Sequence, residues 1–188
     1  TGTVLNVAGA TLSVANQKVG VDFDGSTAEK LNLNFDTVGI AATTTPLAAA
    51  TLITVDLAAG ATANKATSFN ITAKDAYVNL TENTSFATTS ATIAATGINE
   101  IIFTDDAASL TSVSVTGKGS VDLSGAELSA LKTLTAPDGG LTVNANGTVL
   151  ETVTTGAGAD TITVLTAGLS ATATINLGAG DDLLTLAA

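Results

Sequence analysis

Short segments in which apolar and polar residues alternate recur along this chain, each followed by a tight turn and a second such segment. Alternation with a period of two is typical of a strand that buries one face. The turn centres lie near Ala73, Gly97, Gly117, Asp138, Ala157 and Ala179. They recur roughly every 20 to 24 residues, which is in the range of solenoid repeats. A strand–turn–strand unit of this size cannot bury its own apolar side, so it must stack on its neighbours.

The repeat therefore predicts an all-β fold, a right-handed parallel β-helix or β-roll-like solenoid with coils of about 20–22 residues. Ladders of Val, Ile, Leu and Ala would fill its interior. A β-sandwich also has short alternating strands, but it does not require similar turns at a regular spacing. We expect less regular, β-rich coils in residues 1–65, where the spacing is poor, and a regular solenoid in residues 66–188.

One segment, residues 126–132, is a candidate for a helix. Ser124 could cap its first turn, with Glu127 three residues further on as the second half of a capping box. An irregular loop on the outside of one coil explains the same residues.

The charge balance limits the partners of this chain. Its 17 acidic residues and 6 basic residues give a net charge of −11. Nucleic acids and anionic membranes need clustered cations, so we expect neither as a partner. An excess of carboxylates suits a protein that binds divalent cations or must stay soluble until it assembles.

Catalytic chemistry is poorly supported. The chain has no His and no Cys, which excludes imidazole- or thiol-based triads and zinc sites. Paired carboxylates can hydrolyse a glycoside, but Asp22 and Asp24 sit two residues apart on one expected strand, a pattern that surface charge explains better. We therefore do not expect an enzyme.

Two segments, residues 156–164 and 178–186, approximate the calcium-binding nonapeptide G-G-x-G-x-D-x-U-x of RTX proteins. Both depart from it at the first glycine, where Thr155 and Leu177 stand. Glycines let the backbone adopt positive φ and turn its carbonyls inward. Calcium takes six to eight oxygen ligands, so carbonyls and a few carboxylates suffice.

The two segments lie 22 residues apart, about one coil, so their turns should stack on one edge and share a calcium ion. The expected ligands are the carboxylates of Asp160 and Asp182, the carbonyls near Gly156, Gly158, Gly178 and Gly180, and, although it is expected to point outward, Asp181. Glycine turns with solvated Asp side chains are the alternative explanation. Asp138-Gly139-Gly140 is a weaker candidate one coil earlier, and Asp105-Asp106 is interpreted as a solvated pair in a loop.

The runs at residues 110–119, 123–125, 131–134 and 156–160 together resemble bacterial S-layer proteins of the RTX type. The resemblance covers about residues 65–188. It implies a β-solenoid, calcium-dependent folding outside the cell, type I secretion and a two-dimensional lattice. The chain lacks the long runs of consecutive nonapeptides and the anchoring domain of that family, so attachment to the cell surface would come from a region outside this chain.

The function expected from the sequence is thus a structural segment of a secreted, calcium-stabilised surface layer that self-associates at the cell surface. The alternatives are a stalk or binding domain of a large RTX adhesin and a β-helical carbohydrate-active domain. Direct membrane insertion is not expected, because the most apolar stretch, residues 46–55, is about half as long as a membrane-spanning helix.

Overall fold

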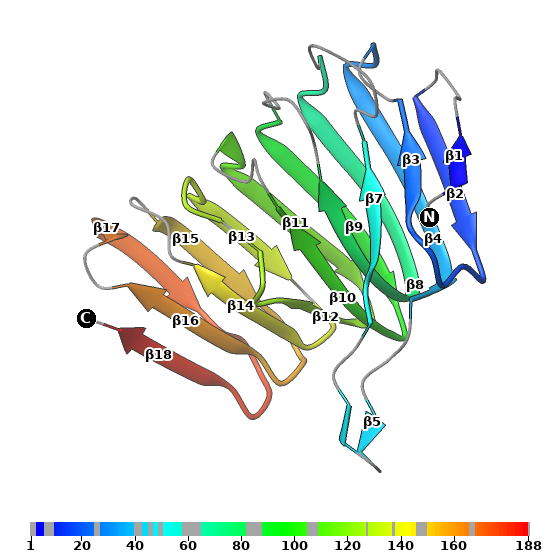
Figure 1. The fold of residues 1–188 in the computed structure, drawn as a ribbon. Helices are drawn as coiled ribbons and strands as arrows, with labels where there is room; N and C mark the ends of the chain where they lie inside the picture. Colours follow the sequence, from blue (N-terminus) through cyan, green and yellow to red (C-terminus); the bar gives the residue numbers. More distant parts are fainter. Residues whose placement is uncertain are drawn as a thin grey trace.

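Strands of this chain pair with strands one coil away, and the pairing is parallel. The computed structural model describes residues 3–5, 10–24, 27–39, 43–44, 47–48, 51–57, 65–81, 88–104, 109–126, 128–136, 138–145, 150–165 and 168–187. Figure 1 shows the paired strands stacked along one axis. Among the described pairings, β5 (Thr43–Thr44) with β6 (Leu47–Ala48) is the antiparallel exception. The chain is a parallel β-solenoid, as the repeat predicts.

The solenoid has two faces, joined by the long strand β8 (Ser68–Thr81). Face 1 consists of the first half of β8 with β2 (Thr11–Ala15), β4 (Lys30–Val38), β9 (Ser90–Thr96), β11 (Ser112–Gly117), β13 (Thr133–Ala136), β15 (Leu150–Thr155) and β17 (Leu169–Asn176). Face 2 consists of the second half of β8 with β1 (Thr3–Leu5), β3 (Val21–Phe23), β7 (Ile53–Asp56), β10 (Ile98–Phe103), β12 (Ser120–Leu123), β14 (Leu141–Ala145), β16 (Thr161–Leu165) and β18 (Leu183–Ala187).

Apart from the β5–β6 pair, the described strands that precede residue 66 belong to the same stack. β4 pairs in parallel with β8, and Lys30 lies opposite Ser68, 38 residues later. Ser68 in turn lies opposite Ser90, only 22 residues further on. The longer interval holds the β5–β6 pair and β7, and β7 takes its place in face 2 between β3 and β8. An insertion between β4 and β7 thus explains why the spacing is poor in this part of the sequence.

The core is thin because the two faces pack directly on each other. Along each strand, alternate side chains point inward and are buried, as in the pattern of β9. The rings of Phe69 on face 1 and Phe103 on face 2 stack in parallel with their centroids 6.2 Å apart. One inward column on face 1 consists of Leu31, Phe69, Ala91, Val113, Leu134, Val153 and Ile175.

The outward positions of face 1 carry short polar side chains in register. One outward column consists of Thr11, Asn32, Asn70, Thr92, Ser114, Thr135, Thr154 and Asn176. Within it, the amide of Asn70 donates a hydrogen bond to Oδ1 of Asn32 at 3.1 Å. The abundance of Thr in this chain follows from such columns, because β-branched side chains suit a pleated surface and a hydroxyl tolerates water.

The segment from 124 to 132 forms turns in its described residues, which exclude residue 127. The N–H of Ala126 donates to the carbonyl of Leu123, and that of Leu131 donates to the carbonyl of Leu128. The side chains of Leu128 and Leu131 are buried in the core. Of the two expectations, the irregular loop therefore fits the described residues, and it is anchored by its two leucines.

The chain turns from face 1 to face 2 at a corner that changes along the solenoid. Asn16, Thr37, Asp75 and Gly97 follow residues that are paired in register, and each has a positive φ, between 47° and 72°. One residue in the left-handed region is enough to bend the strand there. In the later coils the corner is a longer, glycine-rich segment.

Glycines of these later corners stack where a side chain would not fit. A Cβ built on Gly139 would collide with the carbonyl oxygen of Gly119, and one on Gly180 with the carbonyl oxygen of Gly158. A Cβ on Gly158 would likewise collide with the backbone of residues 139 and 140. The glycines are required because successive corners touch through their backbones.

Replacing one of these glycines should therefore destabilise the solenoid. We expect Gly158→Ala to lower the free energy of unfolding by about 1–3 kcal/mol, the range for an overpacked site. Ala157→Ser, at the exposed neighbouring position in the same corner, is the matched control and should stay within about 0.5 kcal/mol of the parent. Urea unfolding followed by circular dichroism measures both, and equal losses would contradict the stacking of the corners.

Candidate metal centre

The two nonapeptide-like segments lie one directly above the other at the corner between the faces. The N–H of Ala179 donates to the carbonyl of Gly156 at 2.6 Å, and the N–H of Leu183 donates to the carbonyl of Asp160 at 2.7 Å. A Cβ on Gly178 would collide with the carbonyl oxygen of Gly156. The structure thus brings the corner residues 156–160 and 178–182 together, as their spacing in the sequence predicts.

The residues that replace the first glycine of the pattern also meet. The hydroxyl of Thr155 donates a hydrogen bond to the carbonyl of Leu177 at 2.8 Å. Thr155 is 4% exposed. The departure from the nonapeptide therefore ties one coil to the next by a side-chain hydrogen bond.

Two of the three acidic side chains of the predicted site, those of Asp160 and Asp182, lie in one column at the start of the face 2 strands, here called the corner column. It contains Ala76, Asn99, Val121, Leu141, Asp160 and Asp182, which follow one another from coil to coil when the register of face 2 is continued by at most one residue. Of these six residues, Asp182 is half-buried and the others are buried. The corner column is therefore an inward-facing position in which polar residues are exceptions.

The carboxylates in this column accept hydrogen bonds from the backbone of the preceding coil. Oδ1 of Asp182 accepts from the N–H of Asp160 at 3.0 Å. Oδ1 of Asp160 accepts from the N–H of Leu141 at 2.8 Å. Each carboxylate therefore ties its coil to the previous one, a role that the sequence analysis did not predict.

Asn99 is a further member of this hydrogen-bonded series, and the sequence analysis missed it. Its Oδ1 accepts from the N–H of Ala76 at 3.0 Å, again one coil earlier. Asn99 is 1% exposed. It stands two residues after Gly97, and a polar residue at a fixed distance behind a corner glycine is the signal that could have identified it.

Asp160 has one oxygen that no protein group satisfies. Its side chain is 1% exposed, and among the buried polar side-chain atoms of the described residues, its Oδ2 is the one without a hydrogen-bond partner. An unsatisfied buried polar atom destabilises a fold by about 1–3 kcal/mol, and by more when it is charged. A second group at this position would therefore stabilise the corner.

These residues fit a cation that binds oxygen ligands if backbone carbonyls supply most of those ligands. Asp160 offers its free Oδ2, and Asp182 is half-buried one coil later, whereas Asp181 is exposed. Within the described residues, no three acidic side chains gather closely enough to hold a metal ion alone. Carbonyls of the glycine corner would have to complete the shell, which calcium accepts.

The weaker candidate, Asp138-Gly139-Gly140, stacks on the same corner but places no acidic side chain in the corner column. Asp138 is exposed, and one coil before Asp160 the corner column holds Leu141, which has no carboxylate to offer. The carbonyl of Gly140 accepts from the N–H of Val121 instead. Asp105 and Asp106 lie outside the described residues.

Acidic residues also meet on the outside of face 2. Glu100 lies opposite Asp122 in register. Burial raises the pKa of Glu100, and the neighbouring carboxylate of Asp122 raises that pKa further. Asp22 similarly lies opposite Asp56. These pairs are surface carboxylates in adjacent strands.

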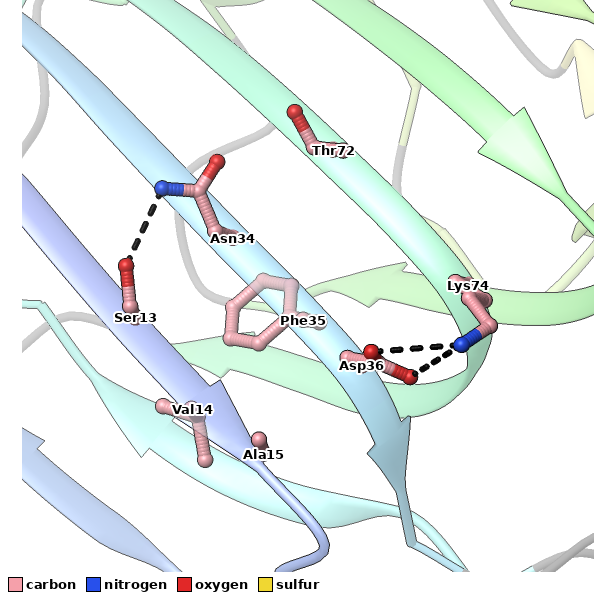
Figure 2. Close-up of a pocket in the computed structure, with 8 residues that line it drawn as sticks. All are labelled: Ser13, Val14, Ala15, Asn34, Phe35, Asp36, Thr72 and Lys74. Atoms are coloured by element: carbon pink, nitrogen blue, oxygen red, sulfur yellow. Dashed lines mark hydrogen bonds and ion pairs between the residues drawn. The ribbon is translucent and has the colours of Figure 1, made fainter.

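A depression of about 270 Å³ lies over β2, β4 and β8, close to the corner. Figure 2 shows Lys74 bonded to Asp36 and the amide of Asn34 bonded to the hydroxyl of Ser13. A hydrogen bond from Thr37 lowers the pKa of Asp36, and the Lys74 ammonium lowers it further. This small depression therefore contains one satisfied ion pair and no second carboxylate.

Comparison with models of known protein families, with curated proteins and with solved structures gave no match. Over the described ranges, the structure has no helix with the length and apolar character needed to cross a membrane.

The raised pKa of Glu100 predicts a pH-dependent stability. The folded chain binds this proton more tightly than the unfolded chain, so ionised Glu100 lowers stability at neutral pH, and stability from this group rises as the pH falls through its folded pKa. We expect Glu100→Gln to raise the Tm slightly, by about 1–3 °C, at pH 7, and the gain to vanish below the ordinary pKa of Glu.

Glu151→Gln is the control, because it also removes one negative charge but from an exposed pair with Lys132. Thermal melting between pH 3.5 and 8 measures both variants. A gain for Glu100→Gln that is the same at every pH would contradict the assigned cause.

Proposed function

We propose that this chain is a calcium-stabilised structural segment of a secreted bacterial surface-layer protein and contributes to a two-dimensional lattice on the cell surface. The observation that carries the proposal is the stacked glycine corner with the buried, unsatisfied oxygen of Asp160. The resemblance of residues 65–188 to S-layer proteins of the RTX type supports it.

The charge on Asp160 explains why an ion would bind at this corner. A carboxylate removed from water needs a compensating charge, because the desolvation of an isolated ion is expensive. A calcium ion would supply that charge and attract the carbonyl oxygens of Gly156, Gly158, Gly178 and Gly180. Asp182 would be the second carboxylate ligand, and Asp181, which is exposed, would contribute from outside.

Calcium dependence would link folding to export. Cytosolic calcium is too scarce to fill a weak site, whereas extracellular modules bind calcium in the range of about 10⁻⁴–10⁻³ M. A ligand that binds the folded chain alone stabilises it by mass action. The segment would therefore gain its full stability after it leaves the cell.

A structural role also suits the surfaces of the solenoid. The outward column of face 1 presents Thr, Ser and Asn along its whole length. Regular faces of this kind allow copies to pack side by side, and we propose self-association in the array as the main contact of this chain. Attachment to the cell surface would come from a region outside it.

Removing calcium should destabilise the chain. We expect the Tm to fall by about 5–10 °C when a chelator replaces about 10 mM calcium. That concentration is about 10–100 times the expected Kd, and calcium then stabilises the folded chain by about 1.4–2.7 kcal/mol. Asp160→Ala combined with Asp182→Ala should melt at a low temperature with and without calcium. Circular dichroism melting curves of the four samples provide the measurement.

Asp22→Ala with Asp56→Ala is the matched control, since it removes two carboxylates that also lie opposite each other but far from the corner in the sequence. It should keep the calcium response of the parent chain. If the chelator leaves the Tm of the parent chain unchanged, the calcium part of the proposal is wrong.

The lattice is tested with the full-length protein. Electron microscopy after addition of calcium should show ordered sheets, and chelation should dissolve them. Extended monomers under both conditions would contradict the lattice and favour the alternative, a stalk of a large RTX adhesin.

A further inference from the structure

Asn99 and Asp160 occupy the same place in the fold, three coils apart in the corner column. The Oδ1 atom of each accepts a hydrogen bond from the residue aligned with it one coil earlier, Ala76 for Asn99 and Leu141 for Asp160. Both side chains are 1% exposed. The two residues therefore hold their first oxygen in the same way and differ in the second atom of the side chain.

The second atom of Asn99 is a donor with two partners. Its Nδ2 donates to the carbonyl of Thr96 at 3.2 Å and to the carbonyl of Ser120 at 3.1 Å. Thr96 precedes Asn99 by three residues in its own corner, and Ser120 lies in the next coil, directly before the residue aligned with Asn99. The amide NH₂ thus joins the carbonyls of two successive coils.

At Asp160 an oxygen stands where Asn99 has its nitrogen. When the register of face 2 is continued by one residue, Asp181 is the equivalent of Ser120. In the sequence, Ala157 precedes Asp160 by three residues, as Thr96 precedes Asn99. A carboxylate oxygen accepts hydrogen bonds but donates none unless it is protonated. Oδ2 of Asp160 accordingly has no hydrogen-bond partner. A buried carboxylate oxygen without a hydrogen-bond partner is costly unless a positive charge lies beside it.

We propose that Asn99 and Asp160 are equivalent positions of the corner column, at which the amide of Asn99 and a cation bound at Asp160 do the same work of joining neighbouring coils. This inference rests on the proposed function and deepens it, because it names what the ion replaces. The corner at Asn99 reaches its full stability without an ion, and the corner at Asp160 reaches it only with one.

The inference predicts that an amide at position 160 removes the need for calcium. Asp160→Asn keeps the size and shape of the side chain and its acceptor for Leu141, and it supplies the missing donor. In chelator, we expect this variant to melt about 5 °C above the parent chain. Its Tm should then rise less with added calcium than that of the parent chain.

Two control variants separate this effect from the loss of a negative charge. Asp181→Asn removes one charge from an exposed side chain of the same corner. Asp182→Asn changes the aligned, half-buried residue, which has no unsatisfied buried oxygen among the described residues. In chelator, each should melt within about 2 °C of the parent chain.

The reverse exchange tests the same idea at the other corner. Asn99→Asp places a carboxylate oxygen against the carbonyls of Thr96 and Ser120, so it should lower the Tm in chelator, and calcium should restore part of the loss. Asn99→Ala is the control, because it also breaks the hydrogen bonds but offers no ligand, and its loss should be independent of calcium.

The outcomes distinguish this inference from the proposed function. If the parent chain responds to chelator and Asp160→Asn responds as strongly, calcium stays and the equivalence of the two corners is wrong. If Asp160→Asn melts at or below the parent chain in chelator, the amide does not fill the missing role and the inference is overturned. If the chelator leaves the Tm of the parent chain unchanged, calcium has no part in either the proposed function or this inference. The Tm difference between Asp160→Asn and the parent chain in chelator then still decides the role of the amide.

Discussion

The structure depends on hydrogen bonding between the backbones of successive coils. Each strand in the interior of the stack gives its N–H and C=O groups to the coils before and after it, and parallel strands lie roughly 4.8 Å apart. The nearest neighbours of a residue are therefore largely the equivalent residues of the two adjacent coils. Inward columns become aliphatic, the outward column of face 1 becomes Thr, Ser and Asn, and corners become glycine wherever backbones touch. The bias in composition is a consequence of this stacking.

The same constraint makes a polar residue in an inward column conspicuous. Asn99 is satisfied through three hydrogen bonds to backbone groups of three successive coils. Asp160 makes one such bond with Oδ1 and leaves Oδ2 unsatisfied. Both residues hold Oδ1 by the same kind of hydrogen bond to the preceding coil, and they differ in the chemistry of the second side-chain atom. Among the buried side-chain polar atoms of the described residues, Oδ2 of Asp160 is therefore the one that points to a ligand.

Sequence periodicity was sufficient for the architecture and for the stacking of the two glycine corners, because both depend on spacing alone. It was insufficient in three places: one insertion breaks the spacing, and the other two depend on which atoms meet after stacking. The insertion that carries the β5–β6 pair hides the period between Lys30 and Ser68. Leu128 and Leu131 look like one face of a short helix, yet they reach the core from a loop. The carboxylates of Asp160 and Asp182 looked like free ligands, whereas one oxygen of each is bonded to a backbone N–H.

These hydrogen bonds change what calcium would do at the corner. If both carboxylates were free, an ion would have to order the turn by itself. With Oδ1 of Asp160 already bonded to Leu141, the turn has its shape before any ion arrives, and the ion would only neutralise a charge that the fold has buried. A site of this kind is pre-organised, so it binds with little loss of conformational entropy. On the proposed function, the Asp at position 160 makes the stability of its coil depend on the calcium concentration. The coil of Asn99, which has an amide at the equivalent position, has a stability that does not depend on calcium.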